Sequence, residues 1–243
     1  MLYCVNLHTI KTKDVMKKYI WSVIACNVMS AIFFISLSPL YSQDNKYHKL
    51  YYQRASLFEN LPIDNNDIVF LGNSITHFGE WHEIFNNPNI KNRGISGDIA
   101  QGVYDRLDHI LSGSPAKIFL LIGINDVSHD LTADSIVFAT RRIAEKISAD
   151  SPHTKLYIQS IFPVNPSFNM FLKATTRGEV VKDINKGLQR LCRELAIQYI
   201  DVYSSLTLPS EDLLNPEYTN DGLHLMGSGY LKWAGVIEKY ILE

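Results

Sequence analysis

Short apolar runs alternate with amphipathic stretches along most of the chain, and this alternation constrains the fold more than any other feature of the sequence. The expected strands lie at residues 67–71, 89–93, 117–122, 156–161 and 200–202, and apart from 89–93 they are largely apolar. Apolar side chains at helical spacing occur at residues 47–59, 99–111, 133–149, 179–196 and 226–242. Strands that are apolar throughout need helices on both faces of their sheet. The pattern predicts an α/β fold, a three-layer α/β/α sandwich with a parallel, flavodoxin-like sheet of about five strands.

Composition limits the number of domains and the classes of partner. The chain has 243 residues, of which 46% are hydrophobic, so residues 44–243 are expected to form one well-packed domain. The formal net charge is −2 and no basic cluster occurs outside the N-terminus, which argues against a nucleic-acid partner. Beyond residue 43 the only cysteine is Cys192, which leaves neither an intramolecular disulfide nor a group of metal-binding thiols.

The N-terminal 43 residues have the pattern of a targeting segment. Lys17 and Lys18 precede residues 19–41, which carry no charge, and Met16 is a possible start. The pattern predicts a signal peptide, an exported periplasmic or extracellular protein, and no stable membrane insertion of the mature domain. Two alternatives remain open, since the uncharged run is long enough for an uncleaved anchor and Cys26 ends a loose match to a lipidation motif.

The first apolar run ends at Gly72-Asn73-Ser74. A glycine at the end of a buried strand permits a sharp turn that exposes the hydroxyl of the following serine, so Ser74 is a candidate nucleophile. The same residue types also occur as ordinary helix caps.

A candidate base lies near the C-terminus, in Asp221-Gly-Leu-His224. A carboxylate three residues before a histidine can hold the Nδ1 proton, which leaves Nε2 free to take a proton from serine. Asp126 and His129 have the same spacing and follow a strand, so His129 is a rival base. Helix capping is the alternative explanation of either pair.

Two candidate donors follow other strands. Gly97 comes after the second apolar run, and Asn125 comes after the third, within Gly123-Ile-Asn-Asp126. Parallel strands end at one edge of their sheet, so both would lie near Ser74 and could supply an N–H and an amide to an oxyanion.

With these residues in place, the chain resembles the SGNH hydrolase superfamily of GDSL-type esterases, whose marker residues are Ser, Gly, Asn and His in separate blocks. Ser74, Gly97, Asn125 and His224 match the four markers, and Asp221 matches the acid of the last block. The match favours His224 over His129. It departs at Asn73, where the GDSL motif has aspartate. Residues 92–110 and 223–237 are most similar to the acetylhydrolase-like branch.

The resemblance implies a Ser74–His224–Asp221 triad and an oxyanion hole formed by the N–H groups of Ser74 and Gly97 and the Asn125 amide. It implies no metal and no cofactor. The activity that it implies for this chain is hydrolysis of short acyl esters, in particular removal of O-acetyl groups from carbohydrate. The partner would then be a small-molecule or glycan ester, and the sequence leaves the oligomeric state open. Substrate contacts are expected from Asn73, His77, Trp81, Phe168 and the rest of residues 163–171. The alternatives are a lysophospholipase or short-chain thioesterase, and a glycan-binding module without turnover.

Overall fold

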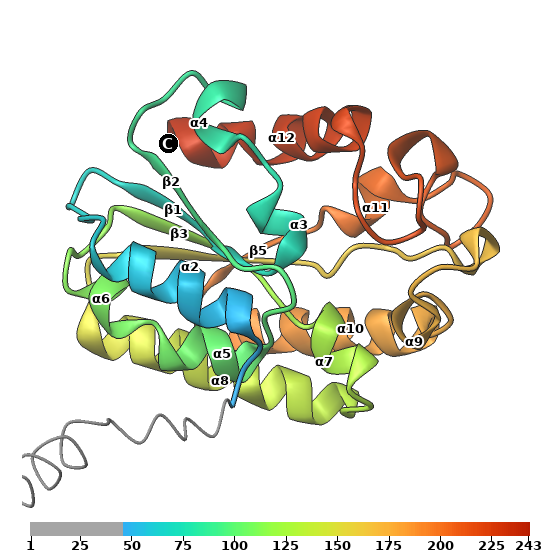
Figure 1. The fold of residues 1–243 in the computed structure, drawn as a ribbon, viewed down its shortest axis with the longest axis horizontal. Coiled ribbons are helices and arrows are strands. Elements are labelled where there is room, and N and C mark those ends of the chain that lie inside the picture. Colours follow the sequence, from blue (N-terminus) through green and yellow to red (C-terminus); the bar gives the residue numbers. More distant parts are fainter. Residues whose placement is uncertain (1–45) are drawn as a thin grey trace, which may run out of the picture. The chain divides into compact units, whose positions relative to one another are not determined.

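The computed structural model describes residues 46–243 (Figure 1). The expected signal peptide at 1–43, the possible start at Met16 and the motif ending at Cys26 lie outside the described residues.

A parallel sheet of five strands forms the centre of the described part of the chain. The strands are β1 (Ile68–Gly72), β2 (Ile90–Gly94), β3 (Lys117–Leu121), β4 (Lys155–Gln159) and β5 (Gln198–Ile200). Their order is β2-β1-β3-β4-β5, and every pairing is parallel. All five residues of β1 are buried. The predicted three-layer fold with a flavodoxin-like strand order is confirmed.

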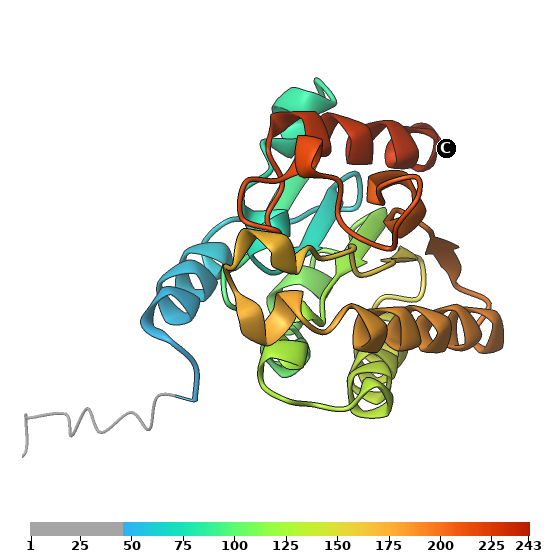
Figure 2. The same cartoon turned by 90° about the vertical axis from the view of Figure 1, so that its right-hand side faces the viewer.

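Helices cover both faces of this sheet, as Figures 1 and 2 show. One face carries α4 (Trp81–Ile84), α11 (Tyr203–Leu206) and α12 (Gly227–Leu242). The other carries α5 (Ala100–Asp105), α8 (Ala133–Asp150) and α10 (Gly178–Glu194), with α8 packed against both of its neighbours. The helix α2 (Lys49–Glu59) buries Tyr51, Ala55 and Phe58 against Ile95, beyond the end of β2.

Stacked aromatic rings join the sheet to α4 and α12. Phe70, Phe119 and Tyr157 occupy one register position on β1, β3 and β4, with ring centroids 5.2 and 4.5 Å apart. Trp81 stacks on Phe70 at 4.3 Å, and Trp233 of α12 meets Trp81 edge-on at 4.4 Å. These rings fill the core beneath the carboxyl ends of the strands.

One predicted helix is wrong as a single element. In place of residues 99–111, the structure has α5 and a separate α6 (Asp108–Leu111). The break lies at Arg106, whose buried guanidinium donates from Nε to Asp98 Oδ2 at 2.9 Å and from Nη2 to the Gly72 carbonyl at 3.1 Å. Helical periodicity in the sequence did not reveal this inward turn.

The other boundaries differ by a few residues, and several short elements were missed. β5 begins two residues before the predicted strand at 200–202. The missed elements are α3 (Ser74–His77), α4, α7 (Ile124–Ser128), η1 (Pro166–Phe168), α9 (Leu172–Thr175), α11 and η2 (Pro216–Tyr218). Within residues 46–243, no helix is both long enough and apolar enough to cross a membrane.

Candidate active site

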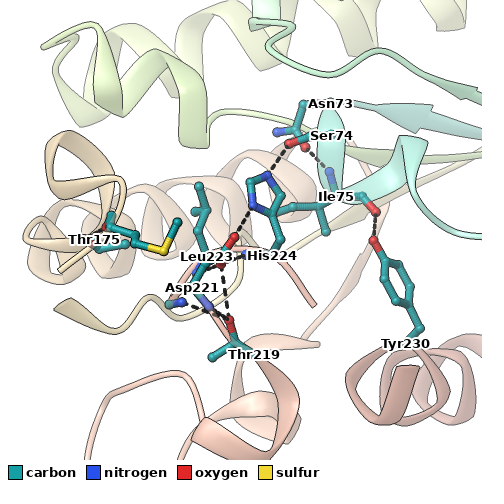
Figure 3. Close-up of polar contacts among 11 residues, drawn as sticks. Asn73, Ser74, Ile75, Thr175, Thr219, Asp221, Leu223, His224 and Tyr230 are labelled. Atoms are coloured by element: carbon teal, nitrogen blue, oxygen red, sulfur yellow. Dashed lines mark hydrogen bonds and ion pairs between the residues drawn. The ribbon is translucent and has the colours of Figure 1, made fainter. Parts of the chain in front are cut away.

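Ser74 begins the short helix α3 directly beyond β1 (Figure 3). The turn into α3 requires Gly72, because a Cβ at this position would lie 2.3 Å from the carbonyl oxygen of Leu121. Asn73 caps the helix, and its Oδ1 accepts a hydrogen bond from the Ile75 N–H at 3.0 Å. The chain therefore leaves the sheet in one abrupt step that places Ser74 at the carboxyl edge.

Side chains from three other elements hold α3 in place. The Tyr230 hydroxyl of α12 donates to the Ile75 carbonyl at 2.8 Å, as Figure 3 shows. Trp81 Nε1 donates to the Thr76 carbonyl at 2.9 Å. Asn92 Nδ2, from β2, lies 2.9 to 3.0 Å from the carbonyl oxygens of Thr76, His77 and Gly79. Carbonyl groups that a four-residue helix leaves free are thus satisfied by side chains, and the serine turn is rigid.

His224 and Asp221 complete a hydrogen-bonded chain with Ser74. Ser74 Oγ lies 3.0 Å from His224 Nε2, and His224 Nδ1 lies 2.7 Å from Asp221 Oδ2 (Figure 3). With the Nδ1 proton directed at Asp221, the Nε2 lone pair faces the serine hydroxyl. Such an arrangement can remove the serine proton during nucleophilic attack.

Backbone groups keep Asp221 ionised and oriented. Its Oδ1 accepts hydrogen bonds from the N–H groups of Leu223 and His224, both at 2.8 Å. Burial alone would raise the pKa of Asp221, but the hydrogen bonds from the His224 ring and from these N–H groups outweigh it and lower the pKa. The Thr219 hydroxyl accepts from the N–H groups of Asp221 and Gly222, which fixes the start of the turn.

The two histidines that share this spacing lie in different surroundings. His129 is an exposed residue at the C-terminal end of α7, and its side chain makes no hydrogen bond within residues 46–243. The Oγ of Ser74 is hydrogen-bonded to Nε2 of His224 instead.

Gly97 and Asn125 also lie beyond the carboxyl ends of strands, Gly97 in the loop after β2 and Asn125 in α7, and hydrogen bonds join the two segments. Gly97 is exposed with a φ of 80°, and its N–H makes no hydrogen bond within the described residues. Asn125 Nδ2 donates to the carbonyl of Asp98, the residue after Gly97, at 2.8 Å. Asp126 accepts from the Ala100 N–H with both carboxylate oxygens, at 3.2 Å each. Hydrogen bonds from Asn125 and Asp126 of α7 thus fix the segment that follows β2.

A buried ion pair connects these loops to the serine turn. Arg106 bridges Asp98 and the carbonyl of Gly72, two residues before Ser74. Burial raises the pKa of Asp98, although the hydrogen bond and charge of Arg106 oppose the shift. Burial also raises the pKa of Asp126, to about 6. Three strand ends are therefore tied together by two buried carboxylates and one guanidinium.

The residues expected to contact substrate lie in different surroundings. Trp81 is 1% exposed within the aromatic core, so its expected contact with substrate is wrong. Asn73 is buried and caps α3. His77 is half-buried with Nδ1 2.9 Å from Ser96 Oγ, and burial followed by the charge of Arg54 lowers its pKa. Phe168 is half-exposed, and its ring lies against Gly222 in the turn that carries the triad acid and base.

Sequence reasoning missed several residues around the site. Asn92 and Tyr230 hold α3, and the ring of Phe78 lies 5.5 Å from that of His224. Phe78 is four residues after Ser74, on the same side of a helical turn, and this spacing could have revealed it. Phe171, within the 163–171 segment, has its ring 5.1 Å from that of His224.

Within residues 46–243 there is no group of three or more His, Cys, Asp or Glu side chains placed to hold a metal ion.

Fold and site together define a hydrolase with a serine at the carboxyl edge of a flavodoxin-like sheet. Residues 70–232 match the model of the GDSL-like lipase/acylhydrolase family. The chain belongs to this family and is an esterase of the GDSL/SGNH type.

Known proteins with similar sequence or structure carry related descriptions. Platelet-activating factor acetylhydrolase IB subunit alpha2 of Homo sapiens is 24% identical over 189 residues, which cover 73% of this chain and 76% of the relative. A structure from Streptococcus pneumoniae, provisionally described as a platelet activating factor, is 28% identical with a TM-score of 0.73, covering 79% of this chain and 93% of that one.

A more distant structure shares the fold. It is a mutant of Axe2, an acetyl-xylooligosaccharide esterase from Geobacillus, and is 15% identical with a TM-score of 0.60. The match covers 74% of this chain and 95% of that one.

Proposed function

We propose that this esterase removes short acyl groups, O-acetyl groups in particular, from carbohydrate through a Ser74–His224–Asp221 triad. The observation that carries the catalytic part is the continuous hydrogen-bonded chain from Ser74 Oγ through His224 to Asp221. Acetyl transfer to water is supported by the names of similar proteins, which include an acetylhydrolase and an acetyl-xylooligosaccharide esterase.

The proposed reaction proceeds in two halves. Ser74 Oγ attacks the ester carbonyl while Nε2 of His224 takes its proton, and Asp221 stabilises the imidazolium. The imidazolium then gives that proton to the departing alcohol as the C–O bond breaks, leaving an acyl group on Ser74. Water, deprotonated by His224, hydrolyses the acyl-enzyme and releases the acid.

Three donors are assigned to the negative charge that develops on the carbonyl oxygen. They are the N–H groups of Ser74 and Gly97 and the second N–H of the Asn125 amide, whose first N–H binds Asp98. This assignment is supported by the hydrogen bonds between the segments that follow β2 and β3, which fix Gly97 relative to Asn125.

A lipid ester is the second candidate substrate, as in a lysophospholipase. It is favoured by the names of the platelet-activating factor relatives and by two exposed apolar side chains beside His224, Phe78 and Phe171.

An acyl-length series with p-nitrophenyl esters tests the proposal. We expect kcat/KM to fall as the acyl chain grows beyond a few carbons. A second assay then measures acetate release from acetylated xylan and from O-acetylated sialic acid. Greater kcat/KM on decanoyl than on acetyl esters would favour the lipid candidate. Folded Ser74→Ala and His224→Ala proteins should lose nearly all turnover, and a wild-type rate in Ser74→Ala would contradict the triad.

We also propose that the protein is exported and cleaved near Gln43, because Lys17 and Lys18 precede an uncharged run. Intact mass and N-terminal sequencing of protein recovered outside the cytoplasm would test this. A mature product that still carries residues 20–37 would contradict it.

A further inference from the structure

We propose that Phe78 and Phe171 form a leaving-group subsite beside His224, which accepts an alcohol with a flat apolar face, such as a sugar ring. This inference rests on the proposed esterase mechanism and concerns the alcohol half of the substrate.

The two phenylalanines come from separate parts of the chain and border the same imidazole. Phe78 ends α3, and its N–H donates to the Ser74 carbonyl at 3.0 Å. Phe171 precedes α9 and meets the imidazole edge-on. Both side chains remain about half exposed, at 52% and 47%. Each therefore presents ring surface to solvent directly beside the base.

Stability of the fold does not explain the position of Phe171. Its φ of 49° and ψ of 40° are left-handed, a conformation that costs a non-glycine residue roughly 1 kcal/mol or more. The N–H groups of Ala174 and Thr175 bind its carbonyl at 2.8 and 3.0 Å and hold this conformation. An exposed ring gains little from burial, so the strained turn serves to display the ring at the site.

Proton transfer determines which half of the substrate meets these rings. Nε2 of His224 must reach the oxygen of the departing alcohol, because the imidazolium returns the proton there as the C–O bond breaks. The alcohol therefore lies beside the imidazole and its two flanking rings. The carbonyl oxygen points to the N–H donors instead, on the side of Gly97 and Asn125.

The chemistry of the rings favours a cyclic alcohol. Aromatic side chains are rigid, and a flat apolar face can lie against them with little loss of conformational entropy. A sugar ring has such a face together with hydroxyl groups at its edge. The exposed amide of Asn169, two residues before Phe171, offers donors and an acceptor to such hydroxyls.

The test compares alcohols at constant acyl group and acyl groups at constant alcohol. Ethyl, cyclohexyl and dodecyl acetate vary the alcohol, and cyclohexyl butyrate varies the acyl group. The variants are Phe78→Ala and Phe171→Gly, since glycine adopts the left-handed turn without strain. Phe138→Ala is the matched control, because Phe138 is a 63% exposed phenylalanine on α8.

For each site variant we expect kcat/KM on cyclohexyl acetate to fall roughly tenfold, the effect of one lost contact of moderate strength. The loss on ethyl acetate should be several times smaller, and cyclohexyl butyrate should show the same loss as cyclohexyl acetate. Phe171→Tyr should restore most of the activity on cyclohexyl acetate, and Phe138→Ala should match the wild type on all four esters.

Three outcomes would overturn the inference. Equal losses on ethyl and cyclohexyl acetate would mean that the rings only hold His224. A loss of kcat/KM that differs between cyclohexyl acetate and cyclohexyl butyrate would place the rings against the acyl half of the substrate. A larger loss on dodecyl than on cyclohexyl acetate would identify a site for an apolar chain. Failure of the esterase mechanism is distinguishable, because Ser74→Ala would then still hydrolyse all of these esters.

Discussion

The side-chain amide of Asn125 has two N–H donors, and one of them already binds the carbonyl oxygen of Asp98. The residue therefore has a structural contact as well as its proposed contact with the oxyanion. The bond to Asp98 fixes the direction of the second N–H, so the donor is oriented before substrate binds. Preorganised donors of this kind stabilise a developing charge without reorganisation during the reaction.

Asn125→Ala should lower kcat by about 10²- to 10³-fold while the triad remains intact, the range typical of one lost oxyanion donor. Steady-state kinetics on p-nitrophenyl acetate would measure the loss. Circular dichroism should show a folded protein. A loss below tenfold would mean that the amide only supports the loop.

Asp221→Asn should fall between Asn125→Ala and Ser74→Ala in its loss of kcat. The Oδ1 of an asparagine can still accept hydrogen bonds from the N–H groups of Leu223 and His224, but its NH₂ group cannot accept a hydrogen bond from Nδ1–H and can hold the imidazole in the wrong tautomer. The same kinetic assay ranks the three variants. A wild-type rate would remove Asp221 from the mechanism.

At the scale of elements, the end of β1 is the most tightly constrained position. A Cβ at Gly72 would meet the Leu121 carbonyl oxygen at 2.3 Å and Thr76 Oγ1 at 2.4 Å, and the carbonyl belongs to the neighbouring strand. A glycine on α12 is the opposite case. Nothing lies within 4 Å of a Cβ at Gly235, which is exposed.

Gly72→Ala should therefore destabilise the protein, by about 2 kcal/mol or more, because the backbone of β3 must shift. Gly235→Ala should stabilise it by about 0.5 to 1 kcal/mol, since alanine has the better helix propensity. Urea unfolding of both variants and the wild type measures the two changes. Similar stability of the two variants would contradict the close approach at Gly72.

The elements that the sequence predicted well are those whose signal is local. The strands β1, β3 and β4 are largely apolar runs, and α8 and α10 carry long amphipathic patterns. The pattern failed at residues 99–111 because the break depends on Arg106 reaching the carbonyl of Gly72, thirty-four positions earlier in the chain. It also failed for α3, α7 and α9, which are too short to show periodicity.

At the scale of the whole molecule, the placement of three proposed site residues could be predicted because parallel strands end at one edge of their sheet. Ser74, Gly97 and Asn125 each follow a strand, and topology brings them together without knowledge of any loop. The position of Phe171 depends instead on how residues 163–171 return toward His224. The burial of Trp81 was missed for a related reason, since it depends on contacts with Phe70 of β1 and Trp233 of α12.

The carboxylate of Asp126, which helps to tie the strand ends together, should also make global stability depend on pH. Burial raises its pKa from an ordinary value of 3.8 to about 6, so the folded protein holds this proton more tightly than the unfolded chain does. Between these two values the folded state binds more protons than the unfolded state, and the free energy of unfolding decreases as pH rises. Well above pH 6 the carboxylate is ionised in both states, and its contribution becomes constant.

Asp126→Asn isolates this effect, because Asp98 has a raised pKa of the same sign and remains in both proteins. From pH 4 to pH 6.5 the wild type should lose about 2 kcal/mol of stability relative to the variant. Above pH 6.5 the difference between the two proteins should be constant. Urea unfolding of both proteins at half-unit intervals of pH measures the difference. A difference that stays constant across this range, or that grows in favour of the wild type as pH rises, would show that Asp126 is not held in a site that favours its protonated form.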